Sequence, residues 1–278
     1  MVLELLRPAG GVLAETMISL DLFRRRPAVV QIPSEILSEI STGILVCTSP
    51  RTGSNHLAGL MAFAGLGNPL EWFGGRRLLE QPGYPRDARG QLLRALTEGR
   101  SSSGIYAIKL FASQFAQVAK KVNLPASLPN LHYVRLTRSD LLGQAISWAR
   151  ARQTRRFRSS EVNRASPRYD GEAIAESLEK ILMENLAWDG WFAKNGLSFL
   201  ALTYEQVQQN PRGSLEKIAQ LAGVEPVWGT NLGSGLEIQR DATNDEWRKR
   251  FLSEYADPSS FPHRKKRGFL KIYKESCD

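Results

Sequence analysis

Residues 44–57 have the composition and order of a phosphate-binding loop. They read I-L-V-C-T-S-P-R-T-G-S-N-H-L, which is a short apolar run, a turn containing Pro50, Arg51 and Gly53, and then a helix start. Backbone N–H groups converge in such a turn, and the following helix directs its positive N-terminal end at a bound anion. The Walker A spacing G-x-x-x-x-G-K-[ST] is absent, because no lysine follows Gly53. The segment therefore indicates anion binding but not a conventional ATPase, although a capped helix with nothing bound has the same pattern.

A second group of polar residues follows the apolar run at 131–136. Arg138 comes directly after this run, and Asp140 can cap the helix that begins there. Gln144 and Ser147 recur at i and i+3 on one face of that helix. An arginine and a helix hydroxyl form a second anion site, near the first but separate from it. The alternative is a capped helix with a solvated arginine.

Glu71 and Lys109 are candidates for proton and charge chemistry. Glu71 stands in the run N-P-L-E-W-F, and Lys109 lies in the apolar run at 105–111, with Gln114 beyond it. A carboxylate can take the proton of an attacking hydroxyl. A buried lysine is rarely unpaired, and it can stabilise charge on a transferred group. A surface glutamate and a lysine that reaches the sheet edge are the alternatives.

Apolar runs that read as strands alternate with helical patterns along the chain. The expected strands are 44–47, 105–111, 131–136 and 197–203, and the expected helices are 54–64, 113–122, one from 139 onward, 172–194 and 211–222. This alternation predicts an α/β fold of the P-loop-like, three-layer type, with a mainly parallel central sheet and helices on both faces. Ligands of such sheets bind at the carboxyl ends of the strands.

Composition limits the function only loosely. The chain has 37 basic and 28 acidic residues, a net charge of +9 and a pI near 9.7, which suits a polyanionic ligand, nucleic acid or an anionic membrane. Its two cysteines provide neither a disulfide framework nor metal-ligand spacing, and we expect no metal. No stretch approaches the roughly 20 apolar residues of a spanning helix, so we expect a cytoplasmic protein. We divide the chain into an N-terminal extension, 1–42, that packs on the core, and a single domain, 43–278.

The chain resembles the sulfotransferases that use 3′-phosphoadenosine 5′-phosphosulfate as donor. It is most similar to the bacterial Stf-zero, trehalose 2-sulfotransferase-like family. Six motifs carry the resemblance in the family's order: S-P-R-T-G-S-N at 49–55, G-N-P-L-E-W-F at 67–73, G-I-Y-A-I-K-L at 104–110, R-S-D-L-L-G-Q-A-I-S at 138–147, L-T-Y-E-Q-V-Q-Q-N-P at 202–211 and Q-R-D-A-T-N-D-E-W at 239–247.

The resemblance implies roles for individual residues. Those assigned to the donor are the loop residues Ser49, Arg51, Thr52, Gly53, Ser54 and Asn55 at the 5′-phosphosulfate, Arg138 and Ser147 at the 3′-phosphate, Tyr204 near the adenine, and Gln239 and Arg240 closing over the nucleotide. Asn55 departs from the threonine that is more usual at its position. The resemblance also makes Glu71 the base. From the chemistry of the side chains themselves we expect Arg51 and Lys109 to be catalytic as well, and we place Glu71, Trp72, Phe73 and Gln114 on the acceptor side, with Trp148 as a further ring for a sugar.

We therefore predict a sulfotransferase that acts on a hydroxyl of a carbohydrate or of another small-molecule or glycolipid acceptor. The resemblance suggests a homodimer, and no nucleic-acid partner is expected. The arginine-rich stretch 150–168 has three readings: it binds the acceptor, it contacts a membrane peripherally, or it is a solvated surface. Two other classes remain as alternatives. A nucleotide or small-molecule kinase would share the loop but would need a Walker lysine and a magnesium-binding aspartate. A basic nucleic-acid- or membrane-binding protein would share only the charge.

Overall fold

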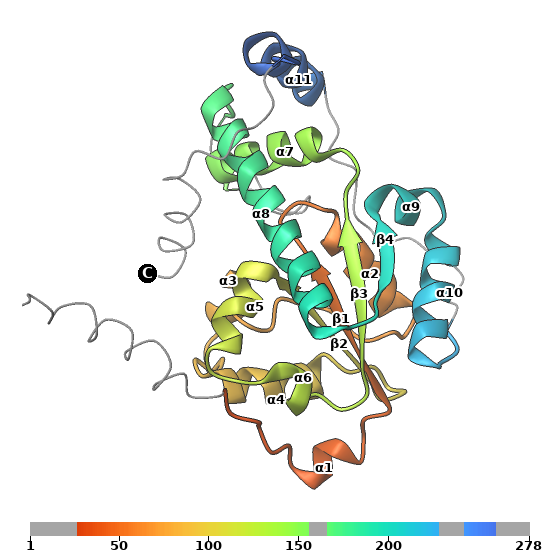
Figure 1. The fold of residues 1–278 in the computed structure, drawn as a ribbon. Helices are drawn as coiled ribbons and strands as arrows, with labels where there is room; N and C mark the ends of the chain where they lie inside the picture. Colours follow the sequence, from red (N-terminus) through yellow and green to blue (C-terminus); the bar gives the residue numbers. More distant parts are fainter. Residues whose placement is uncertain (1–26, 156–165, 228–241, 260–278) are drawn as a thin grey trace, which may run out of the picture.

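A central sheet of four parallel strands organises the protein (Figure 1). The structure is a computed structural model that describes residues 27–155, 166–227 and 242–259. The strands stand in the order β2-β1-β3-β4, with the bounds β1 (Thr42–Thr48), β2 (Ile105–Phe111), β3 (Leu131–Thr137) and β4 (Leu200–Thr203). The register places Thr48 opposite Phe111 and Thr137 opposite Thr203, so the carboxyl ends of the strands meet at one edge of the sheet.

Helices precede, connect and follow these strands along the chain. Their bounds are α1 (Ser34–Leu37), α2 (Ser54–Phe63), α3 (Arg76–Leu79), α4 (Ala88–Glu98), α5 (Ala112–Ala119), α6 (Leu124–Ser127), α7 (Leu141–Thr154), α8 (Gly171–Asn195), α9 (Tyr204–Gln209), α10 (Pro211–Ala222) and α11 (Ala242–Tyr255). Among the described residues, none of these helices has both the length and the apolar character that a membrane span requires.

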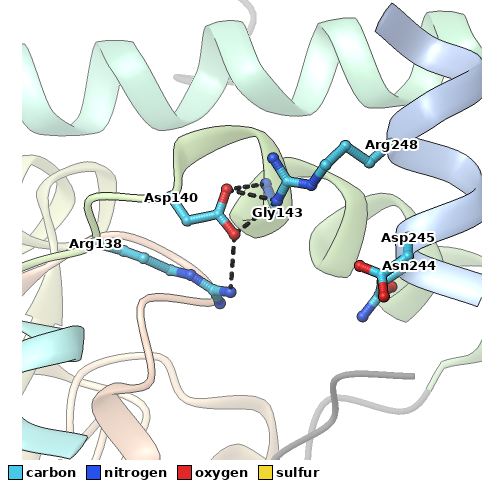
Figure 2. A pocket seen from close by; sticks show the side chains of 6 residues that line it. All are labelled: Arg138, Asp140, Gly143, Asn244, Asp245 and Arg248. Carbon is cyan, nitrogen blue, oxygen red and sulfur yellow. Dashed lines mark hydrogen bonds and ion pairs between the residues drawn. The ribbon is translucent and has the colours of Figure 1, made fainter. Parts of the chain in front are cut away.

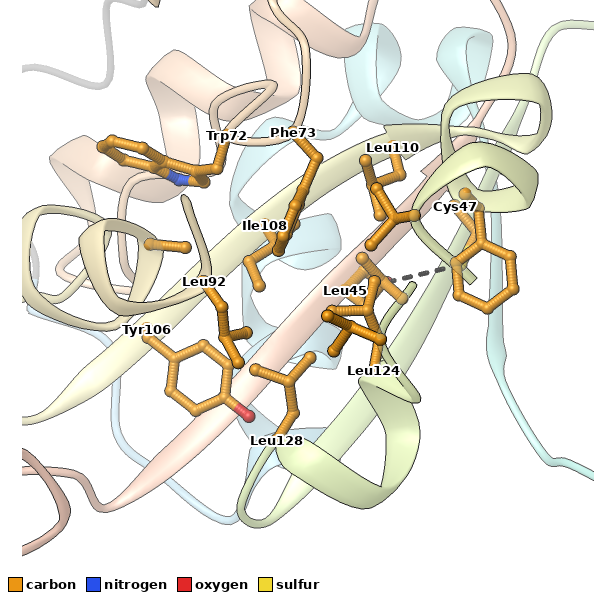
Figure 3. Close-up of a cluster of buried hydrophobic side chains, with 14 of the residues drawn as sticks. Leu45, Cys47, Trp72, Phe73, Leu92, Tyr106, Ile108, Leu110, Leu124 and Leu128 are labelled. Atoms are coloured by element: carbon orange, nitrogen blue, oxygen red, sulfur yellow. Dashed lines mark hydrogen bonds between the residues drawn. The ribbon is translucent and has the colours of Figure 1, made fainter. Parts of the chain in front are cut away.

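Both faces of the sheet are covered by helices. Strand β1 is buried at every position, which is the pattern of a strand enclosed from both sides. Its alternate side chains enter different clusters: Leu45 and Cys47 pack in a cluster with residues of α4, α5 and α8, whereas Ile44 and Val46 pack in a cluster with residues of α2 and α10. Figure 3 shows the first cluster, where Tyr106 of β2 lies among leucine side chains. The predicted parallel α/β fold is therefore confirmed.

A third, smaller cluster joins three helices beyond the carboxyl edge of the sheet. It contains Ala145 and Ile146 of α7, Ile174 of α8, and Trp247 and Phe251 of α11. This cluster attaches α11 to α7 and α8, and α7 follows β3 at the edge of the sheet where ligands of such folds bind.

Some predicted elements have different boundaries in the structure. Strand β4 begins at Leu200 instead of residue 197, because the turn that caps the C-terminal end of α8 includes Leu197. There Gly196 adopts a left-handed conformation with φ of 60°, and the N–H of Leu197 donates to the carbonyl of Phe192. The segment 69–89, where we expected neither a helix nor a strand, contains the short helix α3 and the start of α4 at Ala88.

The N-terminal extension is described only in part. Its first 26 residues lie outside the described residues, and Ala28 pairs with Val122 in an isolated parallel bridge. The N–H of Val30 donates to Ser127 Oγ at 2.9 Å, and Ile36 and Ile40 pack against the first cluster. The packing of the whole extension, and the single domain that we assign to 43–278, stay predictions.

Candidate active site

The loop between β1 and α2 has the backbone of an anion cradle. Arg51 has a φ of 65° and Gly53 a φ of 87°, so left-handed residues alternate with ordinary ones before α2 begins at Ser54. Such alternation directs successive N–H groups into one concavity. A Cβ at Gly53 would lie 2.2 Å from Cδ2 of Tyr204, so the ring of Tyr204 leaves room only for glycine.

The hydroxyl groups of Ser49 and Thr52 in this loop form hydrogen bonds with other groups of the protein. Ser49 and Thr52 are fully buried. Thr52 Oγ1 lies 2.6 Å from Thr48 Oγ1, and it donates to the carbonyl of Ser49 at 3.0 Å. Ser49 Oγ donates to Asn185 Oδ1 at 3.2 Å and accepts from Gln144 Nε2 at 3.1 Å. These contacts shape the loop, so an anion would meet backbone amides there and not the Ser49 and Thr52 hydroxyls that we had assigned to it.

The structure brings the two predicted anion sites together. Arg51 Nε donates to Ser147 Oγ on α7 at 3.0 Å, and Arg138 Nη1 lies 3.4 Å from the carbonyl of Arg51. The guanidinium of Arg138 also stacks over the ring of Tyr204, 5.1 Å from its centroid. Four of the residues assigned to the donor therefore lie at one edge of the sheet.

A cavity of about 340 Å³ opens beside Arg138 (Figure 2). It is lined by Arg138, Asp140, Gly143, Asn244, Asp245 and Arg248. Arg248, from α11, donates to both carboxylate oxygens of Asp140 at 2.6 and 2.7 Å, and Arg138 Nη2 lies 3.7 Å from Asp140 Oδ2. Sequence reasoning did not select Arg248, although it directly follows the last of the six motifs.

The carboxylate of Asp140 forms ion pairs with both arginines that line this cavity. Burial alone would raise the pKa of Asp140, but hydrogen bonds from Arg248 and from the N–H of Gly143, together with the charges of Arg248 and Arg138, bring the pKa below its ordinary value. The same N–H bond caps the start of α7, at 2.9 Å. One carboxylate thus orients two arginines and a helix.

Glu71 and Lys109 form the second half of the site. Lys109 Nζ lies 3.1 Å from Glu71 Oε1, and it donates to Asn55 Oδ1 at 2.6 Å. Gln114 Nε2 donates to Glu71 Oε2 at 3.0 Å. The Lys109 side chain is 2% exposed and that of Glu71 is 26% exposed. Lys109 therefore connects the cradle to a carboxylate that solvent or a ligand can reach.

Trp72 and Phe73 lie in the core and present no open ring to a sugar. They are 2% and 3% exposed and belong to the first cluster (Figure 3). Trp72 Nε1 donates to the carbonyl of Ala107 at 3.1 Å, and its own carbonyl accepts from Tyr84 Oη at 2.6 Å. Their burial argues against the stacking role that we expected and instead fixes the backbone next to Glu71.

Other predicted residues are placed less directly. Trp148 is half-buried and packs against the third cluster, with the guanidinium of Arg152 5.9 Å from its ring. Gln239 and Arg240 lie outside the described residues, as does the middle of the arginine-rich stretch, 156–165. Within the described ranges, no three His, Cys, Asp or Glu side chains form a group that could hold a metal ion.

Helix α8 supplies contacts that sequence reasoning missed. Besides Asn185, it provides Trp188, whose Nε1 donates to the carbonyl of Thr48 at 2.9 Å, and Glu184, which accepts from the N–H of Ser113. The sequence signal was present: polar residues interrupt the apolar spacing of α8 near its centre. That interruption reads equally well as a solvated helix face.

A cradle, a pair of arginines and a lysine-linked carboxylate at one sheet edge define a group-transfer enzyme that handles an anionic substrate. A family model described as Stf0 sulphotransferase matches residues 43–254. The match covers more than half of the chain, so the chain belongs to the Stf0 sulphotransferase family and is a sulfotransferase. The resemblance drawn from the motifs is confirmed, and the kinase and nucleic-acid-binding alternatives lose their support.

Named relatives agree with this membership. The trehalose 2-sulfotransferase of Mycobacterium tuberculosis is 26% identical over 67% of this chain and 79% of that protein. The trehalose 2-sulfotransferase of Mycolicibacterium smegmatis is 25% identical over 77% of this chain and 96% of that protein. Among solved structures, the sulfotransferase domain from the Synechococcus PCC 7002 olefin synthase matches with a TM-score of 0.48 and 15% identity, covering 91% of this chain and 97% of that chain. The structural likeness is too distant to support a further conclusion.

Proposed function

We propose that this sulfotransferase transfers a sulfuryl group from 3′-phosphoadenosine 5′-phosphosulfate to a hydroxyl of a small carbohydrate. The motif resemblance supports the donor, and the names of the two mycobacterial relatives support a sugar acceptor. The observation that carries the proposal is the position of Lys109, whose ammonium contacts Asn55 of the cradle and the carboxylate of Glu71.

The side chains at the sheet edge fit a donor with anionic groups at both ends of a nucleoside. Arg51 lies in the cradle, and Arg138 and Arg248 lie beside the cavity. The close approach of Tyr204 to Gly53 gives the cradle one wall, and the same ring carries the guanidinium of Arg138. When bound, this donor supplies the sulfuryl group and the anionic phosphates that such cations recognise.

Glu71 acts as the general base in this proposal. Its Oε1 faces Lys109 and its Oε2 faces Gln114, so the carboxylate is held in one orientation while part of it stays accessible. An acceptor hydroxyl within hydrogen-bond reach of Glu71 would lose its proton to this carboxylate as its oxygen attacks the sulfur. The bond between the sulfur and the 5′-phosphate oxygen breaks, and adenosine 3′,5′-bisphosphate leaves with the electron pair. The buried anchors Trp72 and Phe73 keep the base from moving with its loop.

In this proposal Lys109 and Arg51 stabilise the negative charge that develops during the transfer. The ammonium of Lys109 is almost completely buried, where a charge interacts more strongly than it does in water. It is placed to stabilise the group in transfer, between the base and the cradle. Arg51 and the amides of the cradle stabilise the negative charge that grows on the phosphate end.

Calorimetry with adenosine 3′,5′-bisphosphate and with AMP tests the donor assignment, because the two nucleotides differ only in the 3′-phosphate. We expect the bisphosphate to bind at least about tenfold more tightly, since one charge-assisted contact to phosphate contributes about 1.5–3 kcal/mol. Equal affinity for both nucleotides would overturn the donor assignment. A screen of hydroxylated acceptors with sulfur-labelled donor, including trehalose and phenols, then tests the acceptor class.

We keep three further assignments as proposals that rest on the resemblance or on composition. They are the homodimer, the peripheral membrane contact through the arginine-rich stretch 150–168, and the cytoplasmic location. Light scattering of the purified chain tests the first, sedimentation with anionic vesicles tests the second, and cell fractionation tests the third.

A further inference from the structure

The start of helix α5 is held by a carboxylate from a different helix. The N–H of Ser113 lies 3.3 Å from Oε1 and 3.2 Å from Oε2 of Glu184 on α8. The N-cap position of α5 is occupied by Phe111, whose side chain makes no capping hydrogen bond. The first N–H groups of a helix need an acceptor, and a negative charge there also interacts favourably with the helix dipole. Glu184 provides both from outside the helix.

The same turn of α5 holds Glu71. Gln114 Oε1 accepts from the N–H of Phe111 at 3.0 Å, which fixes its amide to the beginning of the helix. Its Nε2 then donates to Glu71 Oε2 at 3.0 Å. Both polar atoms of the Gln114 amide are therefore used in orienting the carboxylate, and any shift of the first turn of α5 moves the donor to Glu71.

We propose that Glu184 is a positioning residue for the base Glu71, acting through the first turn of α5 and the amide of Gln114. The inference rests on the proposed function, because that function makes Glu71 the base. It adds a residue outside the six motifs, on a helix that sequence reasoning placed only as cover for the sheet.

The environment of Glu184 is consistent with a fixed position. Burial raises the pKa of Glu184, while hydrogen bonds from Ser113 and Ala112 and the charge of Arg135 act in the opposite direction. A half-buried carboxylate with several donors has few alternative rotamers. The adjacent residue on α8, Asn185, accepts from Ser49 of the cradle, so α8 contacts both halves of the site through neighbouring side chains.

A double-mutant cycle between Glu184 and Gln114 distinguishes positioning from general stability. We expect Glu184→Ala to lower kcat about tenfold or more, since misplacement of a catalytic group by an ångström can cost up to about 100-fold. The KM for the donor should stay within about twofold, because the loss is in the transition state and not in donor binding. Gln114→Ala should have a similar effect, and the double variant should lose no more than the more damaging single change, because both act through one contact.

Two further variants complete the test. Glu184→Gln keeps an oxygen that can accept from the N–H of Ser113, so it should restore most of the kcat lost in Glu184→Ala. If the alanine variant does not fold, Glu184→Met, which keeps the length of the side chain but accepts no hydrogen bond from the N–H of Ser113, takes its place in the cycle with Gln114→Ala. Glu179→Ala removes an exposed carboxylate of the same helix and should leave kcat unchanged.

Three results would overturn the inference. They are additive losses of kcat in the cycle, a parallel loss of donor affinity in Glu184→Ala, and full kcat in that variant. Each of them, with an active wild-type enzyme, leaves the proposed function intact. A wild-type chain that transfers no sulfuryl group to any hydroxyl would overturn both.

Discussion

Replacing Glu71 with glutamine removes the proposed base with the smallest change of shape. General-base catalysis contributes about 10²–10⁴-fold, so kcat should fall at least about 100-fold, or about 2.7 kcal/mol of barrier. Glutamine can still accept from Lys109 Nζ through its oxygen. Its amide nitrogen would then face Gln114 Nε2, which is also a donor and lies 3.0 Å from the present Glu71 Oε2.

Glu71→Gln should also lower the stability of the protein, and the contacts that it removes set the size of this effect. One hydrogen bond is lost, and the ammonium of Lys109, at 2% exposure, loses its anionic partner while it keeps the contact to Asn55 at 2.6 Å. Leaving a buried polar group partly unsatisfied costs about 1–3 kcal/mol. For a domain of this size each kcal/mol corresponds to about 2–4 °C in Tm, so we expect Tm to fall by about 2–12 °C.

Three measurements follow the Glu71→Gln variant: turnover with labelled donor, calorimetry with adenosine 3′,5′-bisphosphate, and thermal unfolding. Nucleotide affinity should stay within about threefold, since Glu71 reaches the cradle only through Lys109. Glu80→Gln, an exposed glutamate of the same segment, serves as the matched control. Turnover within tenfold of the wild type would refute the role of base, and equal losses of turnover and nucleotide affinity would mean that Glu71 is structural.

Three other predictions test the donor side. Arg138→Ala should erase the preference for adenosine 3′,5′-bisphosphate over AMP in calorimetry, and a preference that survives would contradict the second anion site. Gly53→Ala places a Cβ 2.2 Å from the ring of Tyr204 at a φ of 87°, so Tm and bisphosphate affinity should both fall, and an unchanged affinity would speak against the cradle. The pKa of Asp140 is lowered in the folded protein, because hydrogen bonds from Arg248 and Gly143 outweigh burial. Its ionised form therefore stabilises the fold above the unfolded pKa, and this contribution is lost as the pH falls through the lower folded pKa. Asp140→Asn should accordingly lower Tm near pH 7, the Tm difference from the wild type should shrink as the pH falls through the folded pKa of Asp140, and a difference that is constant with pH would contradict this account.

The sheet was predictable because short apolar runs that alternate with helical patterns are typical of buried parallel strands. The alternation of Ile44 and Val46 with Leu45 and Cys47 on two buried faces is typical of a parallel strand, and the structure has it. Helix α4, by contrast, was not predicted. Its apolar stripe is short, and it begins after a Gly- and Pro-rich segment that suggested a loop.

The candidate site was predictable where chemistry and sequence position coincide. Arg51, Arg138 and Glu71 follow strands or belong to motifs, and the structure brings their elements to one edge. The contacts of Glu184 and Arg248 were not predictable, because both side chains reach the site from helices far along the chain. Only tertiary packing decides which face of such a helix meets the sheet edge.

The left-handed backbone of Arg51 has a consequence for attempts to engineer this enzyme. Glycine adopts a φ of 65° without strain, whereas a side chain there costs about 1–2 kcal/mol. Arg51→Gly would relieve this backbone strain, but it would also remove the hydrogen bond to Ser147 Oγ and the cation of the cradle. Any gain in Tm from a change at this position would therefore come with a loss of activity. The loop retains an arginine at the cost of backbone strain, and screens for stable variants need a catalytic readout alongside Tm.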